Sequence, residues 1–147
     1  MSRKTEDLFK RYAAGERNFS GISLDGMDLS GVDLSGADLS NSGLGEAYLE
    51  EANLEGANLR NAHLGQACLV KANLRNADLS GANLGFSYLS RTDLTNAKLV
   101  NAYLSAADMI EANLTGSDLT GADLEGAYME RCVYSNTIMP DGTIRES

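Results

Sequence analysis

The side chains of this sequence that could do chemistry are a single histidine, two cysteines and a few neighbouring acids. His63 directly precedes Leu64, in a position that we expect to face solvent. Acid–base catalysis by His63 would need a second group within hydrogen-bond reach, and the sequence supplies none nearby. We interpret the adjacent acids Glu50 and Glu51 as solvated surface charges. We therefore expect no catalytic residue and no enzyme.

The cysteines and the common cofactor motifs give no further candidate. Cys68 and Cys132 lie too far apart for metal-ligand spacing, and we expect no disulfide between them. The sequence contains no GxxxxGK, GxGxxG or HExxH motif. We expect no cofactor and no metal ion.

The composition indicates one acidic domain. The 147 residues include 21 Asp plus Glu against 12 Lys plus Arg, for a net charge of -9. Such a chain binds nucleic acid and anionic lipid poorly, so we expect no direct nucleic acid partner and no membrane. No apolar stretch approaches the roughly 18 residues of a membrane span, and the charged segment 1–7 gives no signal-peptide core. We expect a cytoplasmic, bacterial-type location.

An apolar residue recurs at every fifth position from Phe19 to Met139 without an insertion. The positions from Leu24 to Leu104 are all leucine, and a small residue, most often Ala, stands two positions before each from Leu39 on, whereas the bulkier Ile22, Met27 and Val32 precede the first three. A five-residue step scatters leucines around a helix and sends them to alternate faces of a long strand. Within one unit, however, the small residue and the leucine share a face, and the two following residues can bend the chain. The chain must therefore coil around a common axis.

This pattern, from about residue 17 to 139, resembles the pentapeptide-repeat protein family, whose consensus is A(D/N)LXX. The resemblance implies an all-β fold. This fold is a right-handed quadrilateral β-helix of about six coils, and each coil consists of four units. We predict three parts: an N-terminal cap helix over 1–15, the pentapeptide-repeat β-helix over 16–139, and a C-terminal turn and tail over 140–147.

The two ends of such a solenoid need covers, because exposed coils would recruit further chains. At the N-terminus, Thr5 is suited to cap a short helix and Gly15 to end it, while Leu8, Phe9 and Tyr12 offer an apolar face. At the other end, residues 139–142 predict a turn that finishes the repeat.

Apolar outward residues gather on one side when the coil is unrolled, because every fourth unit returns to the same side. Six of ten flanking positions on this side are aromatic, aliphatic or Cys, against one of ten on the next side. Aligned apolar groups often mark interfaces, although tyrosine also suits any β surface. We predict an interaction face of seven residues: Tyr48, Cys68, Val70, Phe86, Tyr88, Ile110 and Tyr128.

Two functions fit such a rod. The first is a stiff, non-enzymatic module that binds a protein partner of unknown identity, or itself as a homodimer, through one outer face. The second follows from the resemblance, since the family includes DNA mimics that bind topoisomerases such as DNA gyrase and protect against quinolones. A mimic needs continuous negative charge. Residues 18–59 and 108–130 are acidic, but residues 60–107 form a basic waist between them, so we rank the mimic second. A convex rod predicts no pocket for an enzyme.

Overall fold

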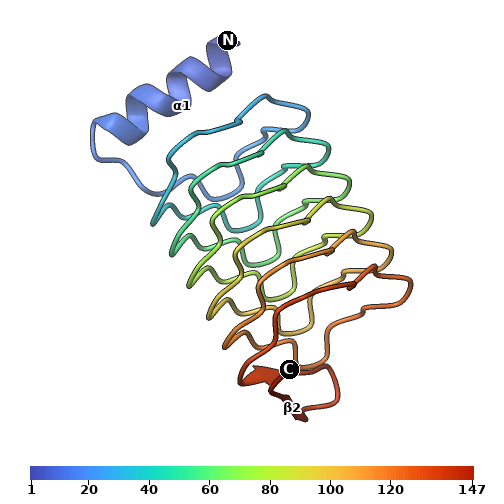
Figure 1. The fold of residues 1–147 in the computed structure, drawn as a ribbon. Helices are drawn as coiled ribbons and strands as arrows, with labels where there is room; N and C mark the ends of the chain where they lie inside the picture. The colour runs from blue at the N-terminus through green and yellow to red at the C-terminus, as the bar shows by residue number, and fades with distance from the viewer.

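Parallel backbone pairing between residues twenty positions apart defines the fold. In the computed structural model, which describes all 147 residues, this pairing runs from Asn18 with Asp38 to Asp118 with Ile138. A step of twenty is four five-residue units, so each coil has four sides. Figure 1 shows the coils stacked into a rod, with the helix at one end and the C-terminus at the other. The repeats therefore form an all-β solenoid, as the sequence predicts.

Each side ends in a tight turn whose third residue has a positive φ. The amide of Ala52 donates to the carbonyl of Leu49 at 3.0 Å, and Glu51 between them has a φ of 59°. Glycine occupies this corner in many units, but Asn, Glu, Lys or Arg occupies it in others. The corner amide also donates to the next coil, as Glu51 does to the carbonyl of Val70 at 2.9 Å. These bonds hold non-glycine residues in a conformation that is unfavourable for an isolated residue.

Leucine and alanine fill the interior of the rod. Every central leucine from Leu24 to Leu119 is at most 1% exposed, and so is every inward alanine from Ala37 to Ala112. The amides of the central leucines pair with the following coil; that of Leu49 donates to the carbonyl of Cys68 at 2.7 Å. Packing and hydrogen bonding therefore brace each coil against its neighbours.

The N-terminal helix α1 spans Arg3–Ala13, within the predicted range, but the prediction that Thr5 caps it is wrong. Ser2 is the N-cap, and its side-chain oxygen accepts from the amide of Thr5 at 3.1 Å. Serine caps helices at least as well as threonine, and starting at Ser2 adds almost one turn to α1. Thr5 is instead a buried residue of the first turn.

The apolar face of α1 covers the first coil. Leu8 is 1% exposed, while Phe9 and Tyr12 pack against the core more loosely. The hydroxyl of Tyr12 donates to the carbonyl of Ser35 at 2.7 Å and fixes the helix to the coil. Gly15, with a φ of 100°, follows the end of the helix. With 11 residues, α1 is too short and too polar to cross a membrane.

The C-terminal residues form a hairpin. Strand β1, Thr137–Ile138, pairs antiparallel with β2, Ile144–Arg145. The predicted turn joins them, since the amide of Gly142 donates to the carbonyl of Met139 at 2.8 Å. The tail is thus an ordered element at the end of the last coil.

Candidate interaction surface

The seven residues predicted to form an interface lie on one side of the solenoid, which we call the tyrosine face: Tyr48, Cys68, Val70, Phe86, Tyr88, Ile110 and Tyr128. Parallel pairing joins Tyr48 to Cys68 and Cys68 to Tyr88, and continues through Asp108 to Tyr128. These side chains therefore stack in one column, about 4.8 Å apart from coil to coil.

Four aromatic side chains of this face are more than half exposed. Tyr48, Tyr88 and Tyr128 have exposed fractions of 57%, 52% and 56%, and Phe86 has 62%. Val70 and Ile110 are half-buried beside them. Sequence reasoning overlooked one exposed aromatic residue on another side, Tyr103, which is 56% exposed. The apolar surface is therefore concentrated on the tyrosine face without being confined to it.

A groove runs along the tyrosine face, with a volume of 710 Å³. It is lined by six of the seven predicted residues; Val70 lies outside the lining. The expectation of a convex surface without a cleft is wrong here. Large side chains such as Phe86 and Tyr88 stand beside small ones such as Cys68 and Ala106, which leaves the hollow between them. The position of a residue in the sequence predicts its column on the solenoid. It does not predict the hollows that form between large and small neighbouring side chains.

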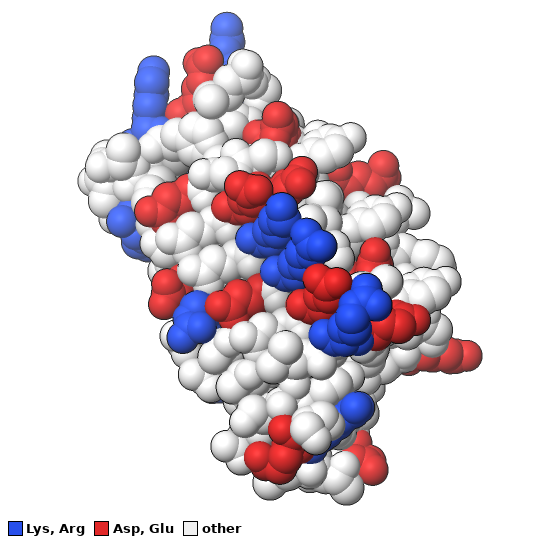
Figure 2. Space-filling model, viewed as in Figure 1, with Lys and Arg blue, Asp and Glu red and all other residues white.

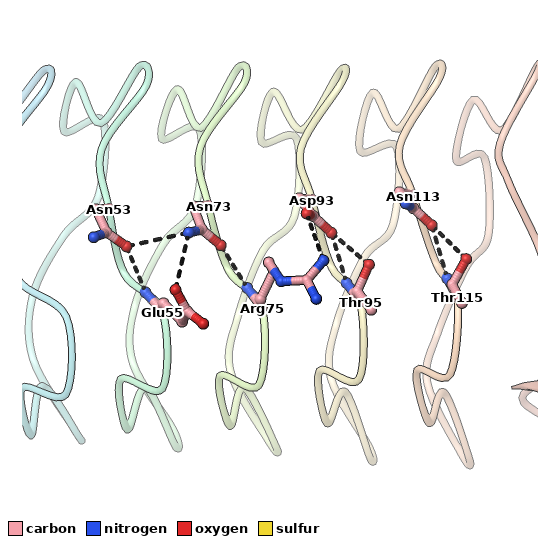
Figure 3. Close-up of polar contacts among 8 residues, drawn as sticks. All are labelled: Asn53, Glu55, Asn73, Arg75, Asp93, Thr95, Asn113 and Thr115. Carbon is pink, nitrogen blue, oxygen red and sulfur yellow. Dashed lines mark hydrogen bonds and ion pairs between the residues drawn. The ribbon is translucent and has the colours of Figure 1, made fainter.

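The tyrosines occupy a position at which most other units carry a turn-stabilising side chain. Asn53 accepts a hydrogen bond from the amide of Glu55 at 3.1 Å, and Asp93 accepts one from Thr95 at 3.0 Å. Figure 3 shows this bond repeated along the neighbouring side. Tyrosine offers no acceptor at that place, and the amides of Glu50 and Ser90 have no partner within the chain. On the tyrosine face only Asp108 makes this bond, to the amide of Ile110 at 3.1 Å, so the units that carry tyrosine lack a local stabilising contact that the neighbouring side has.

A row of charged corner residues, which we call the corner row, borders the tyrosine face: Glu51, Lys71, Arg91, Glu111 and Arg131. Within this row, Glu111 accepts from Arg91 at 3.0 Å and from Arg131 at 3.1 Å. These bonds lower the pKa of the Glu111 carboxyl. Glu51 and Lys71 have no ion pair. Sequence reasoning missed this row because it summed charges over consecutive residues. The row consists of residues twenty positions apart, which lie beside one another in successive coils.

Ion pairs neutralise part of the predicted basic waist. Arg60 lies 3.1 Å from Asp78, Arg75 lies 3.2 Å from Asp93, and Arg91 bonds Glu111. Figure 2 shows basic side chains beside acidic ones in the middle of the visible face. The waist is therefore mixed in charge, with Lys71 and Lys98 unpaired.

The remaining candidates for chemistry lie apart from one another. His63 is exposed on the side of the coil next to the tyrosine face. Cys68 and Cys132 are free thiols. The thiol of Cys132 donates to the carbonyl of Met109 at 3.0 Å, and burial raises its pKa. No group of three or more His, Cys, Asp or Glu side chains is placed to hold a metal ion.

A four-sided β-solenoid built from stacked five-residue units defines a class of repeat protein. The chain belongs to the pentapeptide repeat family, whose model matches residues 18–56, 57–96 and 97–133. No curated protein matches the chain.

Several solved structures are similar to this chain. A pentapeptide repeat protein from the Arabidopsis thaliana thylakoid lumen is 38% identical over 68% of this chain and 66% of its own, with a TM-score of 0.40. One from Nostoc Pcc 7120 is 39% identical over 70% of this chain and 78% of its own, with a TM-score of 0.43. QnrB1, a plasmid-mediated fluoroquinolone resistance protein, is 23% identical over 76% and 68%, with a TM-score of 0.34.

Proposed function

We propose that this protein is a non-enzymatic interaction module, a right-handed rod of about six coils that binds a protein through the tyrosine face. The groove is the observation that carries the proposal. It gathers four largely exposed aromatic side chains on one side of a braced scaffold. Exposed aromatic residues around an apolar hollow are typical of protein-binding surfaces.

The missing turn contacts support an interaction role over simple β-propensity. A tyrosine that merely suits a β surface would be equally acceptable on any side of the coil. Three of the four tyrosines at this position stand in one column, where they leave amides such as those of Glu50 and Ser90 unpaired within the chain, and only Tyr103 stands on another side. Local rules are most often broken at functional sites.

The groove offers contact surface rather than a catalytic arrangement. Its acids, Glu46 and Asp108, accept no hydrogen bond from a nucleophile, and His63 is not part of its lining. We also propose a cytoplasmic location, with which two free thiols are consistent.

Site-specific photocrosslinking tests this function. A photoreactive amino acid in place of Gln66, an exposed residue of the groove lining, should crosslink the partner. The same amino acid in place of Asn76, an exposed corner on the opposite edge of the coil, is the control. The crosslinked protein, identified by mass spectrometry and purified, should bind the wild type directly.

Replacing Tyr48, Tyr88 and Tyr128 together with Ser should abolish both the crosslink and the direct binding. The matched control is Tyr103→Ser, which removes an equally exposed tyrosine from another side. Unchanged binding by the triple variant, or equal crosslinking from Gln66 and Asn76, would contradict the proposal.

DNA mimicry is the second candidate. The ion pairs within the waist, residues 60–107, are an observation in its favour. With Arg60, Arg75 and Arg91 each bonded to an acid, the waist repels a DNA-binding protein less than its sequence suggests. Lys71 and Lys98 remain unpaired, however, so the waist keeps a net positive charge, whereas a mimic of duplex DNA needs it negative. The interaction module therefore stays first.

A DNA gyrase supercoiling assay, with and without a quinolone, decides between the two candidates. We expect no effect of the wild type even at high concentration. Inhibition or protection at low concentration would place mimicry first. In that case, replacing the unpaired Lys71 and Lys98 with Glu should strengthen the effect, because it makes the waist negative.

A further inference from the structure

The row of charged corner residues beside the groove carries charges that are complementary to those of the same row running in the opposite direction. We infer that the partner on the tyrosine face is a second copy of this chain, packed antiparallel about a twofold axis at Tyr88. This inference rests on the proposed function and names the partner.

The charges of the corner row pair when the row is reversed about Arg91. Glu51 then faces Arg131 of the second copy, and Lys71 faces Glu111 of the second copy. Because a twofold contact repeats every pair, the dimer gains four opposite-charge pairs. Glu51 and Lys71, which have no ion pair within one chain, would each acquire one.

The apolar residues match in the same register, except Cys68, which faces Asp108 of the second copy. Reversal about Tyr88 places Tyr48 against Tyr128, and Val70 against Ile110. Phe86 and Tyr88 face their own counterparts at the axis, where aromatic rings can stack. The groove lining runs from Glu46 to Tyr128, so its centre coincides with this axis.

Three like-charge contacts oppose this register, because the twofold axis repeats the first of the two kinds. Glu50 faces Glu130 of the second copy, and Arg91 faces Arg91. Each Arg91 already bonds Glu111 of its own chain at 3.0 Å, which offsets its charge at the axis. The opposite-charge pairs therefore outnumber the unscreened like-charge ones.

A parallel dimer would lack this match. Its twofold axis runs along the rod and sets the corner row against the row on the other edge of the groove: Glu46, Gln66, Phe86, Ala106 and Gly126. That arrangement places Glu46 opposite Glu51 and forms no opposite-charge pair. Charge complementarity thus selects the antiparallel orientation.

The size of the face indicates a reversible dimer. The five coils from Tyr48 to Tyr128 span about 19 Å, and a five-residue side is at most about 16 Å wide. Such a contact lies at the small end of specific interfaces, which bury about 1,200 Å² or less in total.

Two charge-reversal variants test the orientation by sedimentation equilibrium of the full chain. Glu51→Arg and Arg131→Glu each create two like-charge contacts in an antiparallel dimer, so each alone should self-associate more weakly by more than about tenfold. An equimolar mixture should associate as strongly as the wild type, because the arginine introduced in one variant then faces the glutamate introduced in the other. Lys98→Glu, a reversal on the opposite side of the coil, should leave association unchanged.

Each other outcome overturns the inference. A wild type that is monomeric up to millimolar concentration excludes a second copy; the crosslinking test above then decides by itself whether the face binds another protein. A wild-type dimer that the single variants do not weaken, or that their mixture does not restore, excludes the antiparallel register. Circular dichroism of each variant checks that the exposed substitutions leave the fold intact.

Discussion

The residue that precedes each central leucine decides whether its turn is stabilised locally. Asn73 accepts from the amide of Arg75 at 3.0 Å and also donates to Asn53 at 3.3 Å. This explains the preference for Asn or Asp at a position that faces water: a short side chain with an acceptor can reach the amide two residues later. Tyrosine cannot do this, so Tyr48, Tyr88 and Tyr128 give up a hydrogen bond each.

Exchanging the two side-chain types should therefore shift stability in opposite directions. We expect Tyr88→Asn to raise the free energy of unfolding by up to about 0.5 kcal/mol, since it supplies an acceptor for the amide of Ser90. Asn73→Tyr should lower it by about 1 kcal/mol, because it removes such an acceptor. Chemical denaturation of both variants measures these changes. A marked loss of stability in Tyr88→Asn would show that the ring itself stabilises the coil.

A second residue-scale prediction concerns the pH dependence of Asp93. Burial raises the pKa of this carboxyl, but hydrogen bonds from Thr95 and the ion pair with Arg75 outweigh it and hold the pKa below its ordinary value. Unfolding therefore takes up a proton as the pH falls through this range, so the stabilisation is present above the unfolded pKa and is lost in acid. Because the pair is partly exposed, it contributes at most about 1 kcal/mol.

The variant Asp93→Asn keeps the turn acceptor and removes the charge. The wild type should be the more stable of the two at pH 7, and the difference should shrink as the pH falls below the ordinary pKa of aspartate, because the folded pKa lies below it. Asp118→Asn is the control: Asp118 makes the same turn bond, to Thr120 at 2.9 Å, but has no ion pair. Thermal unfolding over this pH range would contradict the assignment if both variants behaved alike.

At the scale of elements, the helix and the hairpin close the two ends of the solenoid. Leu8 on α1 is the most buried residue of the N-terminal cover, and it lies over the coil that contains Phe19 and Leu24. Without α1, the upper edge of this coil would present apolar side chains and unpaired backbone groups to another chain.

Leu8→Asp should therefore detach α1 and cause association through the exposed end. We expect the variant to form larger species in light scattering and to bind a hydrophobic dye, because the first coil becomes accessible. Arg3→Asp adds the same side chain at an exposed position near the start of the helix, where a negative charge is favourable, and should remain like the wild type. A Leu8→Asp protein with unchanged mass would show that the coil needs no cover.

The sequence predicts the elements well where a strict period governs them. Unbroken spacing from Leu24 to Leu104 implies the coil, and the apolar face of α1 implies its position. The N-cap prediction was wrong because Ser2 and Thr5 are both good cap residues, and the sequence alone does not distinguish between them. The pairing of β1 with β2 was missed because two-residue strands carry no periodic signal.

The sequence predicted which residues of the candidate site align on one side of the solenoid, but it did not predict the groove between them. Stepping by twenty brings Tyr48, Tyr88 and Tyr128 together, and the structure confirms that they share one side. The hollow between them depends on the sizes of neighbouring side chains such as Ala106, and the bonds of Glu111 depend on side-chain conformations. Neither quantity is encoded in a single repeat.

At the scale of the whole molecule, each coil contacts only the coils above and below it. A local loss of packing should therefore spread along the rod in a way that depends on position. A defect in a central coil weakens the contact of two large blocks of coils. A defect in the last coil affects only the adjoining end.

Leu74→Ala and Leu124→Ala test this dependence. Leu74 is fully buried in the middle of the rod, whereas Leu124 near the end is partly exposed. Leu74→Ala should cost about 3 to 5 kcal/mol, because it leaves a cavity that braced coils cannot close, and Leu124→Ala about 1 to 2 kcal/mol. Hydrogen exchange should show faster opening on both sides of the central cavity, but only in the C-terminal coils for Leu124→Ala. Equal costs, with exchange accelerated uniformly along the chain in both variants, would mean that the rod unfolds as one indivisible unit, and the coils would then not be the units of its stability.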